Sequence, residues 1–296
     1  MRFFAGLRIF QPMINKNLGR ILGGSRMGIL AAIGICGLCC LTVSADERRF
    51  TYTYEPENMP KGAMEFEQWV TLRTQRSEKG ETPTENFNAW EIKEELEYGV
   101  TDNYSLGFYL KFAAESFRDL TTGEDVSDFE FDGISIENRF MLLNPAEHAI
   151  GLTVYLEPAF SGSEAELEEK IIIGQRYGDW KWAANLVHGT EWEDNFHKTE
   201  GEFEATAGLA RDLNPNWSLG IEFRNHNEIP EYETWENTAF FLGPVVGYRE
   251  EKWWATLTVL PQIYGKNFEG NPDGNESLEL EGHERVNIRL LLGFDF

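Results

Sequence analysis

Long stretches of the chain alternate apolar and other residues with a period of two, and this pattern constrains the fold more than any other feature. One such run contains Tyr104, Leu106, Phe108, Leu110 and Phe112. Side chains on a β-strand point alternately to the two faces of a sheet, whereas a helical face repeats about every 3.6 residues. No stretch of similar length keeps a helical stripe, so we predict an all-β protein.

Twelve alternating segments follow residue 62, and most of them are long. Ordinary strands have about five or six residues, and a tilted strand that crosses a bilayer needs about 9–11. The predicted strands cover residues 63–74, 88–101, 104–117, 127–142, 149–160, 165–177, 179–190, 200–212, 217–228, 235–249, 253–264 and 283–296.

The connections between these segments alternate between short and long. The short turns are 101–103, 143–148, 178–179, 213–216 and 250–252. The longer, mostly acidic connections are 75–87, 118–126, 161–164, 191–199, 229–234 and 265–282. Outer-membrane barrels have short periplasmic turns and longer extracellular loops. We therefore predict a closed antiparallel up-and-down transmembrane β-barrel of about 12 strands over 63–296, with both ends at the periplasmic side.

Aromatic residues flank four of the short turns, as expected for side chains at the level of lipid headgroups. They are Tyr98, Tyr104, Tyr177, Trp180, Trp217, Tyr248 and Trp253. The chain ends in Phe296, after a strand that alternates aliphatic and aromatic residues. This ending resembles the carboxy-terminal signal that outer-membrane barrels present to the barrel-assembly machinery. The expected partners are therefore that machinery and outer-membrane lipid.

A soluble secreted β-sandwich would also alternate and is the competing fold. Some positions fit the barrel less well, because Glu94 and Asn138 fall on the outward parity of their strands. In 127–142 the apolar parity changes, and we interpret the change as a bulge at Asp132-Gly133. Segment 235–249 is apolar on both faces, so its register stays undefined.

The first 45 residues have the pattern of a secretory signal peptide. Residues 1–26 contain five Lys or Arg and no acid, and an apolar stretch then ends at Val43-Ser-Ala45 before Asp46. We predict cleavage between Ala45 and Asp46, with Met13 as an alternative start and a permanent membrane helix as the competing interpretation. Residues 46–62 would form a short periplasmic segment, and the location would be the outer membrane of a Gram-negative-type bacterium.

The composition excludes several classes of protein. A mean hydropathy of −0.41 excludes a polytopic helical membrane protein. Cys36, Cys39 and Cys40 all lie in the leader, so the mature chain cannot use disulfides, thiolate catalysis or Cys-zinc sites. Residues 46–296 contain 21 basic and 50 acidic side chains, a formal charge of −29. This charge excludes a nucleic-acid partner and favours loosely bound divalent cations.

Charged residues occupy the parity that would face the barrel lumen. The predicted lumen residues are Glu65, Glu67, Lys93, Glu95, Glu97, Lys111, Glu137, Arg139, Glu222, Arg224, Arg285 and Arg289. Closure of the barrel should bring Arg285 and Arg289 to Glu65 and Glu67. Two hypotheses stay open: the charges cross-link a filled lumen, or they line a narrow water-filled pore. In a pore, the acidic excess would favour cations or neutral solutes over anions.

No pattern in the sequence indicates catalysis, so we predict a protein that is not an enzyme and has no cofactor. Asn225-His226-Asn227 is the most distinctive histidine group, but no serine stands at a useful spacing, and we assign no catalytic or metal-binding residue. The acidic loop 271–276 has the composition of a calcium loop without EF-hand spacing, which favours a solvated turn.

The start of the mature chain resembles an uncharacterised family of outer-membrane barrels. The similar residues are the turn Pro60-Lys61-Gly62 and the motif Glu65-x-Glu67-Gln68-Trp69 that follows it. The resemblance implies a barrel and no established activity. Together with the strand pattern it predicts a narrow channel for small solutes. The alternatives are a structural or adhesive barrel that acts through its acidic loops, and an embedded hydrolase.

Overall fold

The computed structural model describes residues 47–162, 164–194, 196–270 and 272–296, so the expected leader and the cleavage site at Ala45 and Asp46 lie outside the described residues. Twelve strands lie within a few residues of the predicted segments. They are β1 (Met64–Thr74), β2 (Thr84–Thr101), β3 (Tyr104–Asp119), β4 (Asp125–Leu143), β5 (Gly151–Ser161), β6 (Glu164–Tyr177), β7 (Trp180–Glu193), β8 (Lys198–Asp212), β9 (Trp217–Pro230), β10 (Asn237–Arg249), β11 (Trp253–Asn267) and β12 (Val286–Asp295). Among the described residues there is no helix long and apolar enough to cross a membrane.

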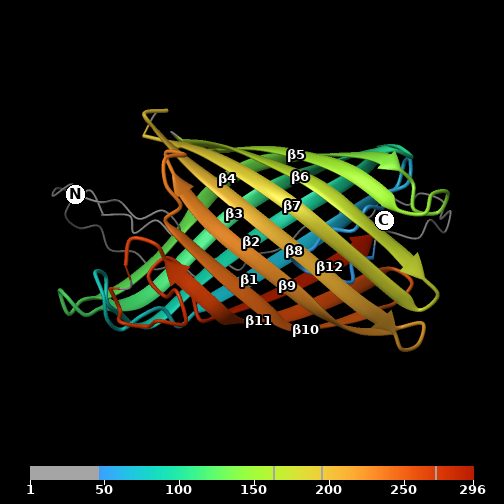
Figure 1. Cartoon of the computed structure of the whole chain (residues 1–296). Helices are drawn as coiled ribbons and strands as arrows, with labels where there is room; N and C mark the ends of the chain where they lie inside the picture. Colours follow the sequence, from blue (N-terminus) through green and yellow to red (C-terminus); the bar gives the residue numbers. More distant parts are fainter. Residues whose placement is uncertain (1–46, 163, 195, 271) are drawn as a thin grey trace, which may run out of the picture.

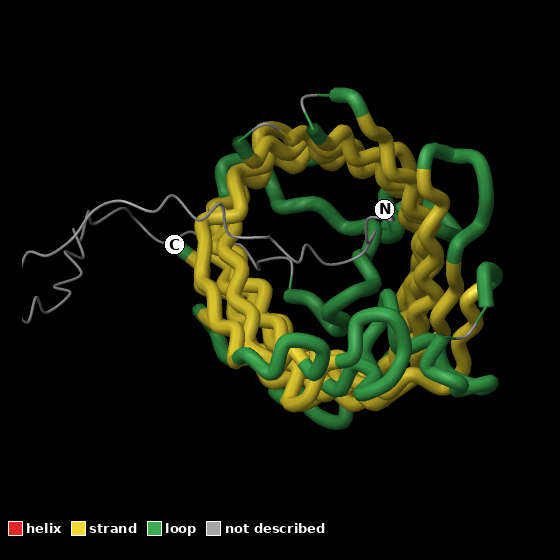
Figure 2. The backbone as a smooth tube through the Cα atoms, turned by 90° about the vertical axis from the view of Figure 1, so that its left-hand side faces the viewer, coloured by secondary structure: helices red, strands yellow, loops and turns green. Residues whose placement is uncertain are grey.

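The twelve strands form one closed antiparallel sheet in which each strand pairs with its neighbours in sequence (Figure 1). The barrel closes where β12 pairs with β1, with Leu72 opposite Ile288. Figure 2 shows the ring of strands end-on. The structure confirms the predicted up-and-down barrel and excludes the sandwich, because all twelve strands of the described residues belong to a single closed sheet.

The short turns lie at one end of the barrel, together with the beginning of β1 and the end of β12. At the other end most strands are longer than predicted, because cross-strand pairing continues into the expected loops, whereas β10 and β12 begin two and three residues later than predicted. The connection predicted at 118–126 is reduced to 120–124, and the one predicted at 191–199 to 194–197. The longest connection is 268–285, between β11 and β12.

The outer surface of the barrel is apolar, as contact with lipid requires. Large apolar side chains stay exposed along the middle of the strands: Leu96, Phe108, Ile136, Ile171, Leu186, Leu209 and Ile221. Exposed aromatic residues surround the short-turn rim, as predicted. A second set, which the sequence analysis missed, lies toward the long-loop rim: Trp90, Phe129, Phe131, Tyr232, Trp235 and Tyr264.

Local irregularities explain the positions that departed from the alternating pattern. Gly133 lies opposite Lys111 and Phe131 lies opposite Phe112, so Asp132 is the extra residue on β4, which confirms the predicted bulge. Asn138 does point outward, and its side-chain oxygen accepts a hydrogen bond from the Tyr104 hydroxyl at 3.0 Å.

An arginine on the lipid-facing surface should destabilise the barrel in proportion to its depth in the bilayer. Leu186 is 52% exposed and lies at the middle of β7. We expect Leu186→Arg to lower the free energy of unfolding in lipid vesicles by about 2–4 kcal/mol, because the charge would face hydrocarbon. Leu213 is 58% exposed in a short turn, so Leu213→Arg should cost about 0–1 kcal/mol. Equal costs in a denaturant titration would contradict this membrane placement.

Candidate functional site: an acidic lumen and the segment that fills half of it

The segment before β1 lies inside the barrel, which corrects the expectation of a short segment in the periplasm. Between residues 48 and 59 all side chains except Glu57 are buried, and Phe50, Thr51, Thr53 and Met59 are fully inaccessible to solvent. Figure 2 shows non-strand chain, drawn in green, inside the ring of strands. We call residues 47–60 the inner segment.

The inner segment enters and leaves the lumen at the short-turn end. Near its start, Arg49 Nε donates to Asp212 Oδ1 at 3.1 Å, at the end of β8. Near its end, Pro60 packs against Gly99 at the end of β2. The Arg49 backbone N–H donates to the Glu55 carboxylate at 3.1 Å, so the chain folds back on itself. The middle of the inner segment, Thr51 to Tyr54, therefore lies deepest in the barrel.

Glu222 on β9 holds the deepest part of the inner segment. Its carboxylate accepts hydrogen bonds from the backbone N–H groups of Thr51 (3.2 Å), Tyr52 (2.7 Å) and Thr53 (2.7 Å). It also accepts one from the Thr258 hydroxyl at 2.8 Å. An isolated buried carboxylate would be costly, and so would three buried N–H groups without acceptors. Because the Glu222 carboxylate and the three N–H groups bind one another, each compensates for the burial of the other.

Two further side chains bind the backbone and the acids of the inner segment. Asn185 on β7 accepts from the Tyr54 N–H at 2.6 Å and donates to the Tyr54 carbonyl at 2.9 Å, as a neighbouring strand would. Lys181 forms ion pairs with Glu55 (3.2 Å) and Glu57 (3.0 Å). Although burial opposes ionisation, the Lys181 ammonium lowers the pKa of Glu57, so this carboxyl stays charged at neutral pH.

Apolar residues on the inner face of the barrel pack against the inner segment. Phe50 contacts a cluster made of Ala183, Ala210 and Val245. The absence of a side chain at Gly208 is required here, because a Cβ atom would lie 2.4 Å from the Phe50 ring.

Tyr52 packs in the same way against Ala239, Phe241 and Leu260. These contacts explain why β10 is apolar on both faces: its outer face belongs to the apolar outer surface of the barrel, and its inner face contacts the inner segment.

Aromatic rings and cations form a layer across the middle of the lumen. Tyr54 packs with Trp69, Tyr109 and Tyr155. The Arg48 guanidinium lies 4.1 Å from the Tyr54 ring centre and 4.5 Å from that of Trp69, in cation–π geometry. Burial raises the pKa of both Tyr52 and Tyr54, which keeps these hydroxyls neutral. The layer separates the filled short-turn half from the rest of the lumen.

The other half of the lumen contains a cavity of about 390 Å³. Tyr52, Tyr54 and Trp69 form its floor, and its walls reach the long-loop ends of the strands. Sixteen carboxylates and six Lys or Arg side chains line it. The negative excess gives the cavity a potential that attracts cations and repels anions.

The predicted lumen residues divide into three groups. Five acids and one arginine are at most 3% exposed next to the inner segment: Glu65, Glu67, Glu95, Glu97, Glu137 and Arg139. Four basic residues line the cavity: Lys93, Lys111, Arg224 and Arg289. Glu222 anchors the inner segment, as described above.

One predicted residue and one predicted pairing were wrong. Arg285 is exposed and precedes β12, because that strand begins three residues later than predicted. In the register of β1 and β12, Arg289 lies opposite Thr71 and Asp295 lies opposite Glu65. Arg289 and Glu65 are therefore about 20 Å apart along the sheet. Arg289 instead lies 3.7 Å from Glu91, and Glu67 has Arg48 of the inner segment at 3.9 Å.

The sequence analysis missed the inner segment, although one signal could have indicated it. Ala239, Phe241 and Val245 occupy the parity that should face water in an open pore. Apolar side chains on that parity need other apolar groups inside the barrel to shield them from water. Phe50, Tyr52 and Tyr54, in the aromatic-rich stretch before the first strand, could have been identified as those groups.

Comparison with protein families gives a match that spans residues 42–296. The model of DUF6662, a family of unknown function, matches residues 42–171 and 167–296. The chain belongs to this family. A comparison with curated proteins found no match.

Solved structures with a similar fold are outer-membrane barrels. One is the COG4313 outer membrane channel from Pseudomonas putida F1, with 13% identity and a TM-score of 0.58 over 83% of this chain and 100% of that one. Another is the P. putida toluene transporter TodX, with 10% identity and a TM-score of 0.41 over 80% of this chain and 91% of that one. The DUF6662 chain thus shares the barrel fold of outer-membrane proteins.

Removal of the Glu222 carboxylate should release the inner segment. Thr53 is a suitable reporter, because it is fully buried and its hydroxyl has no hydrogen-bond partner among the described residues. We expect a maleimide to label Thr53→Cys slowly. Adding Glu222→Ala should accelerate labelling roughly tenfold or more, since each buried N–H left without an acceptor costs ~1–3 kcal/mol.

The exposed Glu251, in a short turn, provides the matched control. Glu251→Ala should leave the labelling rate of Thr53→Cys unchanged. Equal labelling rates in the Glu222→Ala and Glu251→Ala backgrounds would show that Glu222 does not hold the inner segment.

Proposed function

We propose that this DUF6662 protein is a bacterial outer-membrane channel for small cationic or neutral solutes, with the inner segment as its gate. The acidic cavity that ends on the inner segment carries this proposal. A purely structural barrel has no need of a water-accessible cavity lined by charge. The barrel shared with the outer membrane channel from P. putida supports the same role.

The charges of the cavity favour cations for a physical reason. Carboxylates outnumber Lys and Arg among the lining residues, and several of the basic side chains are already paired. Arg224 lies 2.5 Å from Glu204, and Lys170 lies 2.8 Å from Glu168. The unbalanced charge that a solute meets is therefore negative, so anions would have to enter against the potential.

The inner segment suits a gate because polar contacts hold much of it. Its deepest part is held by hydrogen bonds to two single side chains, Glu222 and Asn185. Water can replace such bonds when the segment moves. A strand of the barrel could not leave in this way, because its whole backbone ladder would be broken. Release of residues 47–60 would join the cavity to the short-turn end of the lumen.

The location and the remaining partners are part of the same proposal. The exposed apolar surface of the barrel fits outer-membrane lipid. Phe296 is 81% exposed at the short-turn rim, where the barrel-assembly machinery could bind the carboxy-terminal strand. The acidic cavity can also hold divalent cations loosely.

Conductance in planar bilayers tests the proposal directly. We expect wild-type protein to show small or rare openings, and a variant that lacks residues 47–60 to show larger, frequent openings with a cation-selective reversal potential in a salt gradient. The physical reason is that the deletion empties the filled half of the lumen. Glu251→Ala should behave as wild type.

Each part of the proposal has its own contradicting result. A deletion variant that folds, as judged by a heat-modifiable gel shift, and yet never conducts would refute the channel. Equal conductance of the wild type and the deletion variant would refute the gate. An anion-selective reversal potential would refute the proposed selectivity.

A further inference from the structure

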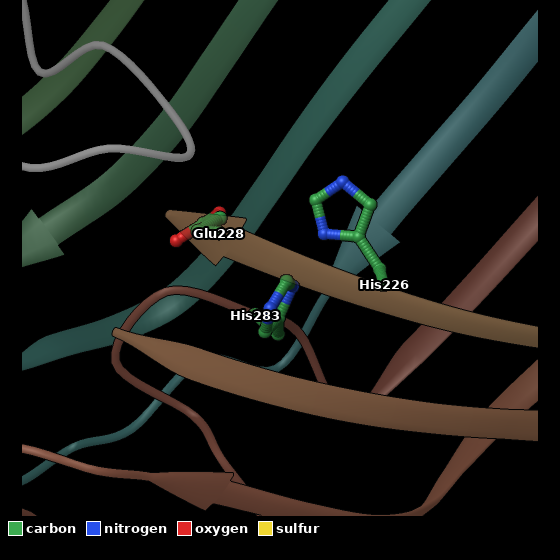
Figure 3. A group of neighbouring side chains, drawn as sticks. All are labelled: His226, Glu228 and His283. Atoms are coloured by element: carbon green, nitrogen blue, oxygen red, sulfur yellow. The ribbon is translucent and has the colours of Figure 1, made fainter. Parts of the chain in front are cut away.

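We propose that His226, Glu228 and His283 form a binding site for a divalent transition-metal ion, with Zn²⁺ as the best match. One potential ligand atom from each residue lies within 4.8 Å of the others (Figure 3). All three side chains are buried, with exposed fractions of 8%, 2% and 5%. The site does not depend on the proposed channel function.

Two separate parts of the chain bring the three residues together. His226 and Glu228 stand two positions apart on β9, so both side chains face the lumen. His283 comes from the connection 268–285, where the Glu279 carboxylate accepts a hydrogen bond from the His283 N–H at 3.0 Å. The two imidazole rings are 5.1 Å apart and nearly perpendicular.

Neighbouring side chains orient each potential ligand so that one atom of it is left for a metal. His226 Nε2 lies 3.4 Å from Glu202 Oε2, and His283 Nε2 lies 2.9 Å from Asn237 Oδ1. Because these oxygens are acceptors, each Nε2 carries the proton and each Nδ1 keeps its lone pair. Asn237 also donates to one Glu228 oxygen at 2.5 Å. Metal-binding histidines generally have their second nitrogen held in this way.

Two of the atoms that remain have no hydrogen-bond partner among the described residues. His226 Nδ1 and Glu228 Oε1 are both buried without a hydrogen bond. In Figure 3 the nearer ring nitrogen of His226 points toward His283 and Glu228. A buried carboxylate oxygen and an imidazole lone pair both lack a donor here, and a bound cation would satisfy the two together.

The surrounding charges permit a dication. Three arginines lie near enough to influence His283, and each has a carboxylate partner. Arg224 pairs with Glu204, Arg73 pairs with Glu91, and Arg76 lies 3.4 Å from Glu284.

The donor set selects the class of metal. Two imidazole nitrogens and one carboxylate oxygen suit Zn²⁺ and its neighbours, whereas Ca²⁺ and Mg²⁺ prefer oxygen ligands alone. Three protein ligands leave a fourth position open, and all three residues also line the cavity, from which the ion could enter. A bound ion would join the connection 268–285 to β9 at the long-loop end of the cavity.

Zinc titration of the folded, metal-stripped full barrel tests this proposal. We expect isothermal calorimetry to show one Zn²⁺ bound tightly per chain, and X-ray absorption at the zinc edge to show two imidazoles and one carboxylate as protein ligands. His226→Asn, His283→Asn and Glu228→Gln should each weaken binding at least ~10-fold. Glu202→Gln, which changes only the support of His226, should weaken it about 10–100-fold.

Two control variants separate this site from loose binding by surface acids. His148→Asn removes an exposed histidine at the short-turn end, and Glu115→Gln removes another carboxylate of the cavity. Both should bind zinc as the wild type does. Unchanged binding in the three ligand variants would overturn the proposal, and so would no tight binding in the folded wild type or a spectrum without imidazole. If a variant fails the heat-modifiability check, the spectrum of the wild type still decides the question.

Discussion

The structure depends on the need to pair every backbone N–H and C=O group that is removed from water. In a bilayer no solvent can replace a missing partner, so a sheet must close on itself. The pairing of β1 with β12 meets this requirement and removes the last free edges. Long strands, the outward apolar parity and short turns at one end all follow from that closure.

Backbone groups buried in the lumen also need hydrogen-bond partners, but side chains rather than a neighbouring strand supply them. The inner segment has no strand ladder around its deepest residues, so side chains take over as partners. Glu222 accepts three consecutive N–H groups, and Asn185 pairs with both polar groups of the Tyr54 backbone. Because single side chains supply these bonds, the proposed release of the inner segment would break no strand pairing of the barrel wall.

Charge is distributed along the lumen according to access to water. Next to the inner segment, buried acids lie close to Arg48 and Arg139, since a dry interior tolerates charge only with a partner. In the cavity, hydrated carboxylates are left in excess and create a negative potential. At the long-loop end of β9, His226 and Glu228 each offer a buried lone pair without a donor close to His283, and a bound cation would complete that cluster.

The sequence alone was enough to predict the barrel, its twelve strands, the bulge at Asp132 and the side of the short turns, because each depends on a period of two or on local turn composition. It also placed most of the lumen charges on the inward parity. It did not predict that residues 47–60 fold into the barrel, since the side chains that hold this segment, Glu222 and Asn185, lie far away in the sequence. The pairing of Arg48 with Glu67, and the meeting of His283 with His226, were decided only by the tertiary structure. Arg48 reaches Glu67 because the inner segment folds back into the lumen, and His283 reaches His226 because the connection 268–285 packs against β9.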